Sequence, residues 1–154
     1  MSHPAQRLAD LDITLPEPPE PVAAYIPAVK TGNLVFISGQ IPLSGGQVAW
    51  TGPVPSRVGI DEARNAARQC AINALAVLTG QVGGDLSRVK QIVRLGVFVC
   101  SDPGFHQQPK VANGASELLV EIFGEAGRHA RAAVGSVALP LGATVEVEMI
   151  VEIA

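Results

Sequence analysis

Residues 130–154 read ARAAVGSVALPLGATVEVEMIVEIA, and this stretch decides which fold the chain adopts. It divides at Leu139-Pro140-Leu141-Gly142, a turn signal between two runs in which apolar residues alternate, or nearly alternate, with small or charged residues. Alternation with a period of two is typical of strands that bury one face. We therefore predict a β-hairpin, or a pair of connected strands, at the end of the chain.

Charged residues interrupt both of these predicted strands. Arg131 opens the first strand, and Glu146 and Glu148 lie in the second, on the face opposite Val145 and Val147. An arginine and a glutamate on neighbouring strands have two interpretations, a cross-strand ion pair or an active site. The spacing alone favours the ion pair slightly and leaves both interpretations open.

The bulk composition narrows the class of protein. A length of 154 residues fits one domain, and the net charge of -3 without a basic cluster argues against a nucleic-acid partner. No run approaches the roughly 20 apolar residues of a membrane-spanning helix. The polar start of the chain does not resemble a signal peptide, so we expect a cytoplasmic protein without a membrane partner. The apolar fraction of 47% suggests surface hidden at subunit contacts, and hence a homo-oligomer.

The order of the predicted elements indicates an α+β fold. A short helix and a proline-rich connector form an N-terminal extension, residues 1–21, before a single domain, residues 22–154. The domain is predicted to contain strands at 22–30, 34–38, 47–50 and 89–100, helices at 60–80 and 105–123, and the two final strands. This order predicts a mostly antiparallel six-stranded sheet with both main helices packed on one face.

The helix expected at 60–80 has one stripe of small side chains, including Ala63, Ala67 and Ala74, which suits close packing on a sheet. Arg64 and Arg68 fall off this stripe, and we expect them on a solvated outer face. Nothing within the chain covers the other face of the sheet, which again predicts assembly.

Several kinds of catalytic site are not indicated. The three histidines are far apart in sequence and no HxH, HExxH or CxxC spacing occurs, so no metal site is predicted. No glycine-rich phosphate loop is present. Ser38 and Ser136 lack the surroundings of a nucleophilic serine, and Cys70 and Cys100 are expected to be buried free thiols. The residues alone therefore suggest an oligomeric α+β domain whose arginine could bind a small acid.

Two segments carry a resemblance to a known family. Residues 32–42, GNLVFISGQIP, resemble the G-N-x-x-x-x-S-G-Q-x-P strand of the RidA (YjgF/YER057c/UK114) family. The C-terminal A-R-A-A-V-G, L-P and V-E-V-E motifs resemble the second signature of that family, in the same order. The similarity extends from about residue 22 to the C-terminus, and the two signatures together make it specific.

The resemblance implies a chorismate-mutase-like fold, a homotrimer with three clefts between subunits, and an enzyme. Members with the arginine hydrolyse reactive enamines and imines, such as 2-aminoacrylate, to 2-keto acids and ammonia without a metal or an organic cofactor. By position, Arg131 matches the arginine that binds the substrate carboxylate. Glu146 matches the glutamate that orients the attacking water, and Glu148 is the second choice for this role.

Further positions are implied by the same resemblance to contact the substrate. Tyr25, Ser38 and Gly39 match residues that line the cleft, and Asn113 is a looser match to a helix asparagine near the site. Ala133 stands where many deaminating members have cysteine, so only its backbone N–H is available there.

Departures from the family pattern leave an alternative function open. The second long helix and the N-terminal extension are longer than in the best-known members, which suggests a divergent subgroup. The alternative is a non-catalytic small-carboxylate-binding or regulatory trimer that uses the same arginine. An isomerase of the chorismate mutase type is a more distant possibility, because the fold alone does not imply that function.

Overall fold

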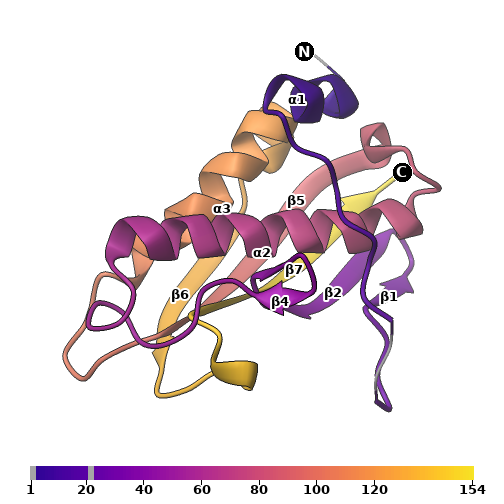
Figure 1. Cartoon of the computed structure of the whole chain (residues 1–154). Helices are drawn as coiled ribbons and strands as arrows, with labels where there is room; N and C mark the ends of the chain where they lie inside the picture. The colour runs from indigo at the N-terminus through magenta and orange to yellow at the C-terminus, as the bar shows by residue number, and fades with distance from the viewer. Residues whose placement is uncertain (1–2, 21–22) are drawn as a thin grey trace.

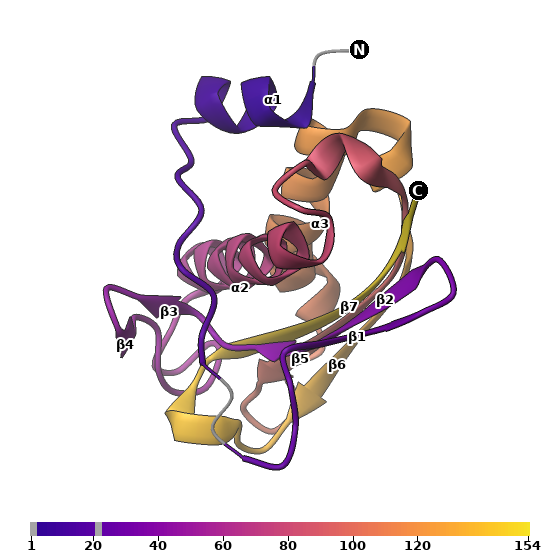
Figure 2. The same cartoon turned by 90° about the vertical axis from the view of Figure 1, so that its right-hand side faces the viewer.

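Two helices cover one face of a twisted β-sheet in the computed structural model, which describes residues 3–20 and 23–154 (Figure 1 and Figure 2). The order across the sheet is β1-β2-β7-β5-β6. These strands are Ala28–Thr31 (β1), Leu34–Gln40 (β2), Val89–Cys100 (β5), Ala130–Ser136 (β6) and Val145–Ile153 (β7). The two long helices are Ile60–Gln81 (α2) and Gln108–Phe123 (α3). The predicted α+β class and the placement of both helices on one face are confirmed.

The strand count differs from the prediction. The strand predicted at 47–50 is β4 (Gln47–Val48), which pairs with β3 (Leu43–Ser44) in a separate two-stranded sheet. The main sheet of the described residues therefore has five strands, not six. Asn73 of α2 explains the difference, because its Nδ2 donates to the carbonyl oxygens of Ile41 (3.0 Å) and Leu43 (3.1 Å). These hydrogen bonds hold the small hairpin against the helix rather than at the sheet edge.

The two C-terminal strands are connected but do not form a hairpin, because β5 lies between them. Strand β6 pairs with β5 in parallel through the crossover helix α3, and β7 pairs antiparallel with both β5 and β2. The connection between β6 and β7 contains a short 3-10 turn, η3 (Pro140–Gly142). This turn is bound to the loop before α2, because the Gly52 N–H donates a hydrogen bond to the Gly142 carbonyl (2.9 Å). Alternation identified the strands but not their partners.

Two element starts also differ. The strand expected at 22–30 begins at Ala28, and residues 21–22 lie outside the described ranges. Before it, Pro27 has no N–H to pair, and its carbonyl accepts a hydrogen bond from the Ser38 N–H (2.8 Å). The helix expected from residue 105 begins at Gln108, with Pro109 in its first turn, where the missing N–H is tolerated.

The N-terminal segment packs on the same core as the rest of the chain. The predicted short helix is α1 (Pro4–Asp10), whose Leu8 is buried, and Leu11, Ile13 and Leu15 also lie against the core. Figure 1 shows α1 beside α3 and the following segment passing α2. The proposed boundary between residues 21 and 22 falls outside the described residues, and it stays a prediction.

The small side chains of α2 are buried as expected. Its two arginines, Arg64 and Arg68, do not lie on a face that contacts only solvent, contrary to the prediction. Ala63, Ala67 and Ala74 are fully buried. Arg64 instead forms an ion pair with Glu117 of α3 (2.9 Å). Arg68 lines a hollow of about 560 Å³ between α2, the small hairpin and residues 11–19. Both arginines lie at contacts with other segments because α3 and the N-terminal segment pack beside α2.

The sheet face opposite the helices carries both apolar and acidic side chains. On β7 the odd-numbered residues from Val145 to Ile153 are buried, so Glu146 and Glu148 lie on the opposite, helix-free face. Across the neighbouring strands Val29, Phe36 and Val134 are 52%, 42% and 46% exposed. None of the helices within residues 3–20 and 23–154 has the length and apolarity needed to cross a membrane.

Candidate functional site

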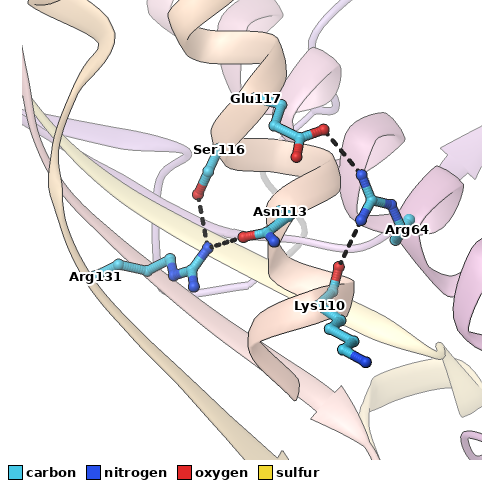
Figure 3. A network of polar contacts seen from close by, with 6 residues as sticks. All are labelled: Arg64, Lys110, Asn113, Ser116, Glu117 and Arg131. Carbon is cyan, nitrogen blue, oxygen red and sulfur yellow. Dashed lines mark hydrogen bonds and ion pairs between the residues drawn. The ribbon is translucent and has the colours of Figure 1, made fainter. Parts of the chain in front are cut away.

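Arg131 lies on the edge strand β6 and faces the helices. It is opposite Leu95 of β5, which is fully buried against them. Its Nη1 donates hydrogen bonds to Asn113 Oδ1 (2.8 Å) and Ser116 Oγ (3.1 Å), both on α3. Figure 3 shows the two bonds converging on one guanidinium nitrogen. Helix α3 therefore fixes the arginine at one end of its planar group.

Close contact between the two long helices sets the position of these α3 residues. A β-carbon on Gly114 would lie 2.0 Å from the Arg64 carbonyl oxygen, so only glycine permits this approach. The Arg64–Glu117 ion pair spans the same contact, and Arg64 also lies 3.5 Å from the Lys110 carbonyl oxygen (Figure 3). Asn113 and Ser116 are three residues apart and thus share one helix face, directed at β6.

The other donors of the Arg131 guanidinium are available. Asn113 and Ser116 of α3 accept both Nη1 hydrogens, whereas Nε and Nη2 form no hydrogen bond with any residue in the described ranges. The residue is exposed, so this edge faces open space. An Nε–H and an Nη2–H point in parallel and match the two oxygens of a carboxylate. The arrangement is suited to binding a small acid side-on.

Glu146 belongs to a second group of predicted site residues. A β-carbon on Gly39 would lie 2.2 Å from Glu146 Oε1, so the carboxylate occupies the space over the glycine. The pairing of β2 and β7 is irregular between Ile37 and Gln40, at this glycine. Ser38 Oγ donates to the Ile26 carbonyl (2.8 Å), which brings the segment containing exposed Tyr25 alongside. The structure therefore groups Ser38, Gly39 and Glu146, with the Tyr25 segment next to them.

The environment of Glu146 favours its protonated form. Burial raises the pKa of its carboxyl group, and the negative charge of Glu148 raises it further. Glu148 itself is engaged in a 3.4 Å ion pair with Arg94, above Gly96. Glu146 has no ion-pair partner within the described part of the chain. A raised pKa and an unpaired carboxylate are properties of a general base, so Glu146 is the better candidate of the two.

Arg131 and Glu146 do not form the cross-strand ion pair that the spacing favoured. Arg131 shares the helix-facing side with Leu95 and Met149, whereas Glu146 pairs with Phe98 on the opposite side. One chain therefore places the two groups on different faces of the sheet. Asn113 joins the Arg131 group through its hydrogen bond, and Ala133, two residues after Arg131 on β6, packs partly buried on the same side.

Two further residues near Arg131 were not predicted from the sequence. Ser116 contacts the guanidinium directly, and its Oγ also lies 2.9 Å from Nε2 of His129. His129 precedes Arg131 by two residues and is half-buried. The spacing of Ser116 from Asn113, one helical turn, was the only available signal, and it had no meaning without the position of β6.

The remaining polar and thiol groups do not assemble a metal centre. No group of three or more His, Cys, Asp or Glu side chains suited to a shared metal ion occurs in residues 3–20 and 23–154. Cys70 and Cys100 are buried free thiols, as expected. Burial is the main factor that raises the pKa of Cys70, which makes it a poor nucleophile.

Comparisons with known proteins agree with this fold. A family model described as "YjgF/chorismate_mutase-like, putative endoribonuclease" matches residues 5–153. Protein TCP17 of Trypanosoma cruzi is 43% identical over 150 residues, covering 97% of this chain and 93% of that protein. A 2-iminobutanoate/2-iminopropanoate deaminase of Dermatophagoides farinae is 30% identical over 142 residues, covering 92% and 94%. The crystal structure of Atu1372 from Agrobacterium tumefaciens matches with a TM-score of 0.92 and 44% identity, covering 98% and 93%. The expected chorismate-mutase-like fold is thereby confirmed.

Proposed function

The chain belongs to the YjgF/RidA family, and from this premise we propose that it hydrolyses enamines and imines of the 2-aminoacrylate type to 2-keto acids and ammonia. The observation that carries the proposal is the guanidinium of Arg131, held through Nη1 and open along its Nε and Nη2 edge. The name of the deaminase from Dermatophagoides farinae supports the same reaction class.

Arg131 binds the substrate carboxylate. Two parallel hydrogen bonds from a charged fork fix the plane of the carboxylate, and with it the adjacent imine carbon. Ala133 offers a backbone N–H beside the substrate, and Asn113 holds the arginine. Tyr25, Ser38 and Gly39 line the opposite wall of the cleft.

Glu146 activates water for the chemical step. The enamine first tautomerises to the imine by moving a proton from nitrogen to its methylene carbon, and the imine reacts in its N-protonated form. The Glu146 carboxylate accepts a proton as the water oxygen bonds to the imine carbon, and the C=N electron pair moves to the nitrogen, which becomes an uncharged amino group. Glu146 then returns its proton to the nitrogen of the resulting carbinolamine, the C–N bond breaks to release ammonia, and the hydroxyl proton passes to the Glu146 carboxylate as the C=O bond of the keto acid forms. That proton finally leaves with the ammonia as ammonium, which regenerates the carboxylate. Atoms and charge balance with water as the only co-reactant, and the proposed reaction uses no metal or organic cofactor.

A second copy of the chain completes the site. Because Arg131 and Glu146 lie on opposite faces of one sheet, a cleft that contains both requires Arg131 from one copy and Glu146 from its neighbour. The open edge of β6 and the exposed apolar face at Val29, Phe36 and Val134 provide two different contact surfaces. Repeated contacts between two different surfaces form a ring when the rotation between copies closes, and we propose a closed homotrimer with three such clefts.

Small-molecule chemistry fits the charge distribution better than RNA cleavage, the activity in the family description. The net charge is -3, and Glu146 and Glu148 lie on the open face of the sheet. Carboxylates repel a phosphate backbone, whereas nucleic-acid sites carry clustered basic side chains. We therefore propose that no nucleic acid is bound.

The experiment is a timed assay of keto-acid release from 2-aminoacrylate generated in situ. We expect the wild-type chain to accelerate release, and Arg131→Ala to lower kcat/KM by about a hundredfold or more because a bidentate charged contact is lost. Arg128→Ala is the matched control, since that exposed arginine has only a weak pairing with Glu125 at 3.7 Å.

Other outcomes separate the alternatives. No acceleration over buffer by the wild-type chain rules out the deaminase. If calorimetry in that case shows a 2-keto acid bound through Arg131, the non-catalytic carboxylate-binding trimer replaces it. Full activity of Arg131→Ala would mean that the carboxylate is bound elsewhere.

A further inference from the structure

We propose that Ser116 and His129 are positioning residues for Arg131, which orient the guanidinium so that its Nε and Nη2 edge is presented to the substrate carboxylate. The identity of that carboxylate rests on the proposed function. The hydrogen-bond chain itself does not, because it is formed by side chains of α3 and of the segment before β6.

Each hydrogen bond in the chain has a fixed direction. Nδ1 of His129 lies 2.6 Å from the Gly127 carbonyl oxygen, which can only accept, so Nδ1 carries the hydrogen. In the neutral ring Nε2 is then an acceptor, and the Ser116 hydroxyl donates to it across 2.9 Å. The Ser116 hydrogen is thereby directed away from Arg131, and a lone pair of Oγ accepts from Nη1 at 3.1 Å.

This direction matters because a hydroxyl can either donate or accept. A serine without the histidine is free to rotate its hydrogen toward the guanidinium, which cannot accept it. With the neutral ring in place, Ser116 and Asn113 each take one Nη1 hydrogen. The guanidinium is then restrained about its own axis, and less orientational freedom is lost when the carboxylate binds.

The surroundings of His129 favour the neutral ring that the chain requires. Burial lowers the pKa of the imidazole, and the positive charge of Arg131 lowers it further, against an opposing effect of the Gly127 hydrogen bond. The neighbouring segments carry seven other charged side chains: Arg128, Glu125 of η2 (Gly124–Gly127), Lys110, Glu117 and Glu121 of α3, and Lys90 and Arg94 of β5. At neutral pH the ring accepts from Ser116, and acidification reverses that bond and adds a second positive charge.

The proposal is tested by kinetics on paired variants. We expect Ser116→Ala and His129→Leu each to raise KM about tenfold with kcat nearly unchanged, because a carboxylate clamp stabilises substrate and transition state alike. Ser116→Thr and His129→Gln keep the hydroxyl and an acceptor, and should restore KM to within about threefold of wild type.

Matched controls distinguish positioning from a general effect. His106 makes the same local contact, from its Nδ1 to the carbonyl of Gly104 two residues earlier (3.1 Å), with no arginine attached. His106→Leu should leave KM unchanged. Acidification should raise the wild-type KM because the charged ring no longer accepts from Ser116, and this rise should be absent in His129→Gln, which cannot titrate. Wild-type KM in both Ser116→Ala and His129→Leu would overturn the proposal.

A spectroscopic measurement keeps this inference separable from the proposed function. ¹⁵N chemical shifts of the His129 ring at neutral pH should report the Nδ1–H tautomer, and Ser116→Ala should shift the Nε2 resonance. A charged ring or the Nε2–H tautomer would refute the positioning role even in an active enzyme. If the Nδ1–H tautomer is observed but the chain shows no turnover, only the deaminase function is refuted. The effect of the variants is then measured as the affinity for a 2-keto acid by calorimetry, in place of KM.

Discussion

The carboxylate of Glu146 occupies the space above Gly39 that any side chain at that position would fill. A β-carbon there would lie 2.2 Å from Oε1 and 2.9 Å from the carboxyl carbon. The glycine of the Ser38-Gly39 motif is thus explained by the room that the candidate base needs, and not by backbone conformation.

Gly39→Ala should therefore act on catalysis through Glu146. We expect kcat to fall about tenfold or more because the carboxylate moves away from the water that we propose it activates, while the melting temperature changes little. Gly80→Ala, in open space on α2, is the control and should leave kcat unchanged. An alanine variant with wild-type kcat would show that Glu146 is not the base, or that it tolerates the shift.

Two inactive variants should complement each other when mixed. Arg131 and Glu146 lie on opposite faces of the sheet, so a composite cleft can take an intact arginine from one copy and an intact glutamate from another. Arg131→Ala and Glu146→Gln are unfolded together in equal amounts and then refolded together. Half of the chains then carry an intact Arg131 and the other half an intact Glu146, so about a quarter of the clefts should contain both, and about a quarter of wild-type activity should return. The same mixture without refolding is the control. Persistent inactivity of correctly assembled mixed oligomers would place both residues in a cleft from one chain.

The acid limb of the pH profile should depend on Glu148. Its negative charge raises the pKa of Glu146, so Glu148→Gln should move the acid limb of kcat/KM to lower pH. Loss of Glu148 also releases Arg94 from its ion pair, which acts in the same direction. Glu152→Gln removes an equal charge farther along β7, where Glu152 accepts a hydrogen bond from Asn33, and should leave the limb in place. An unmoved limb in Glu148→Gln would mean that another group controls it.

Gly114→Ala should destabilise the fold. The new methyl group would lie 2.0 Å from the carbonyl oxygen of Arg64, a backbone atom that cannot move aside without displacing α2. We expect a loss of about 1–3 kcal/mol in the free energy of unfolding, measured with denaturant. The same substitution at Gly80, which meets nothing within 4 Å, should instead gain up to about 1 kcal/mol from helix propensity. Equal stability of the two variants would show that the helices can separate freely.

Local sequence patterns predicted the helices and strands well where apolar residues recur with a regular spacing or where a turn or capping residue marks the end of the element. The bounds of β5 agree with those predicted, and α2 differs by one residue. Strand pairing could not be predicted from local patterns, because the partner of each strand depends on how all the strands of the sheet are arranged. The turn at Leu139-Pro140 indicated a hairpin, yet β7 is inserted between β2 and β5, where both its edges are paired.

The candidate site shows the same difference between what local sequence predicts and what depends on the arrangement of the whole fold. Arg131, Glu146, Ser38 and Gly39 lie in motifs that are contiguous in sequence, so resemblance could identify them. Their distribution over two faces depends on strand order and was not foreseen. His129 and Ser116 belong to no motif, because their relation exists only after α3 has crossed from β5 to β6.

The raised pKa of Glu146 means that its charged carboxylate lowers the stability of the folded chain at neutral pH. A carboxyl whose pKa is higher in the folded chain favours folding below its ordinary pKa of 4.5, and this contribution disappears as the pH rises through the folded value. At neutral pH the charged carboxylate is therefore less favourable to folding than its protonated form is at low pH. We therefore expect Glu146→Gln to give a more stable protein that lacks the candidate base. We expect a laboratory screen for thermostable variants that ignores turnover to accept Glu146→Gln and so to lose the candidate base.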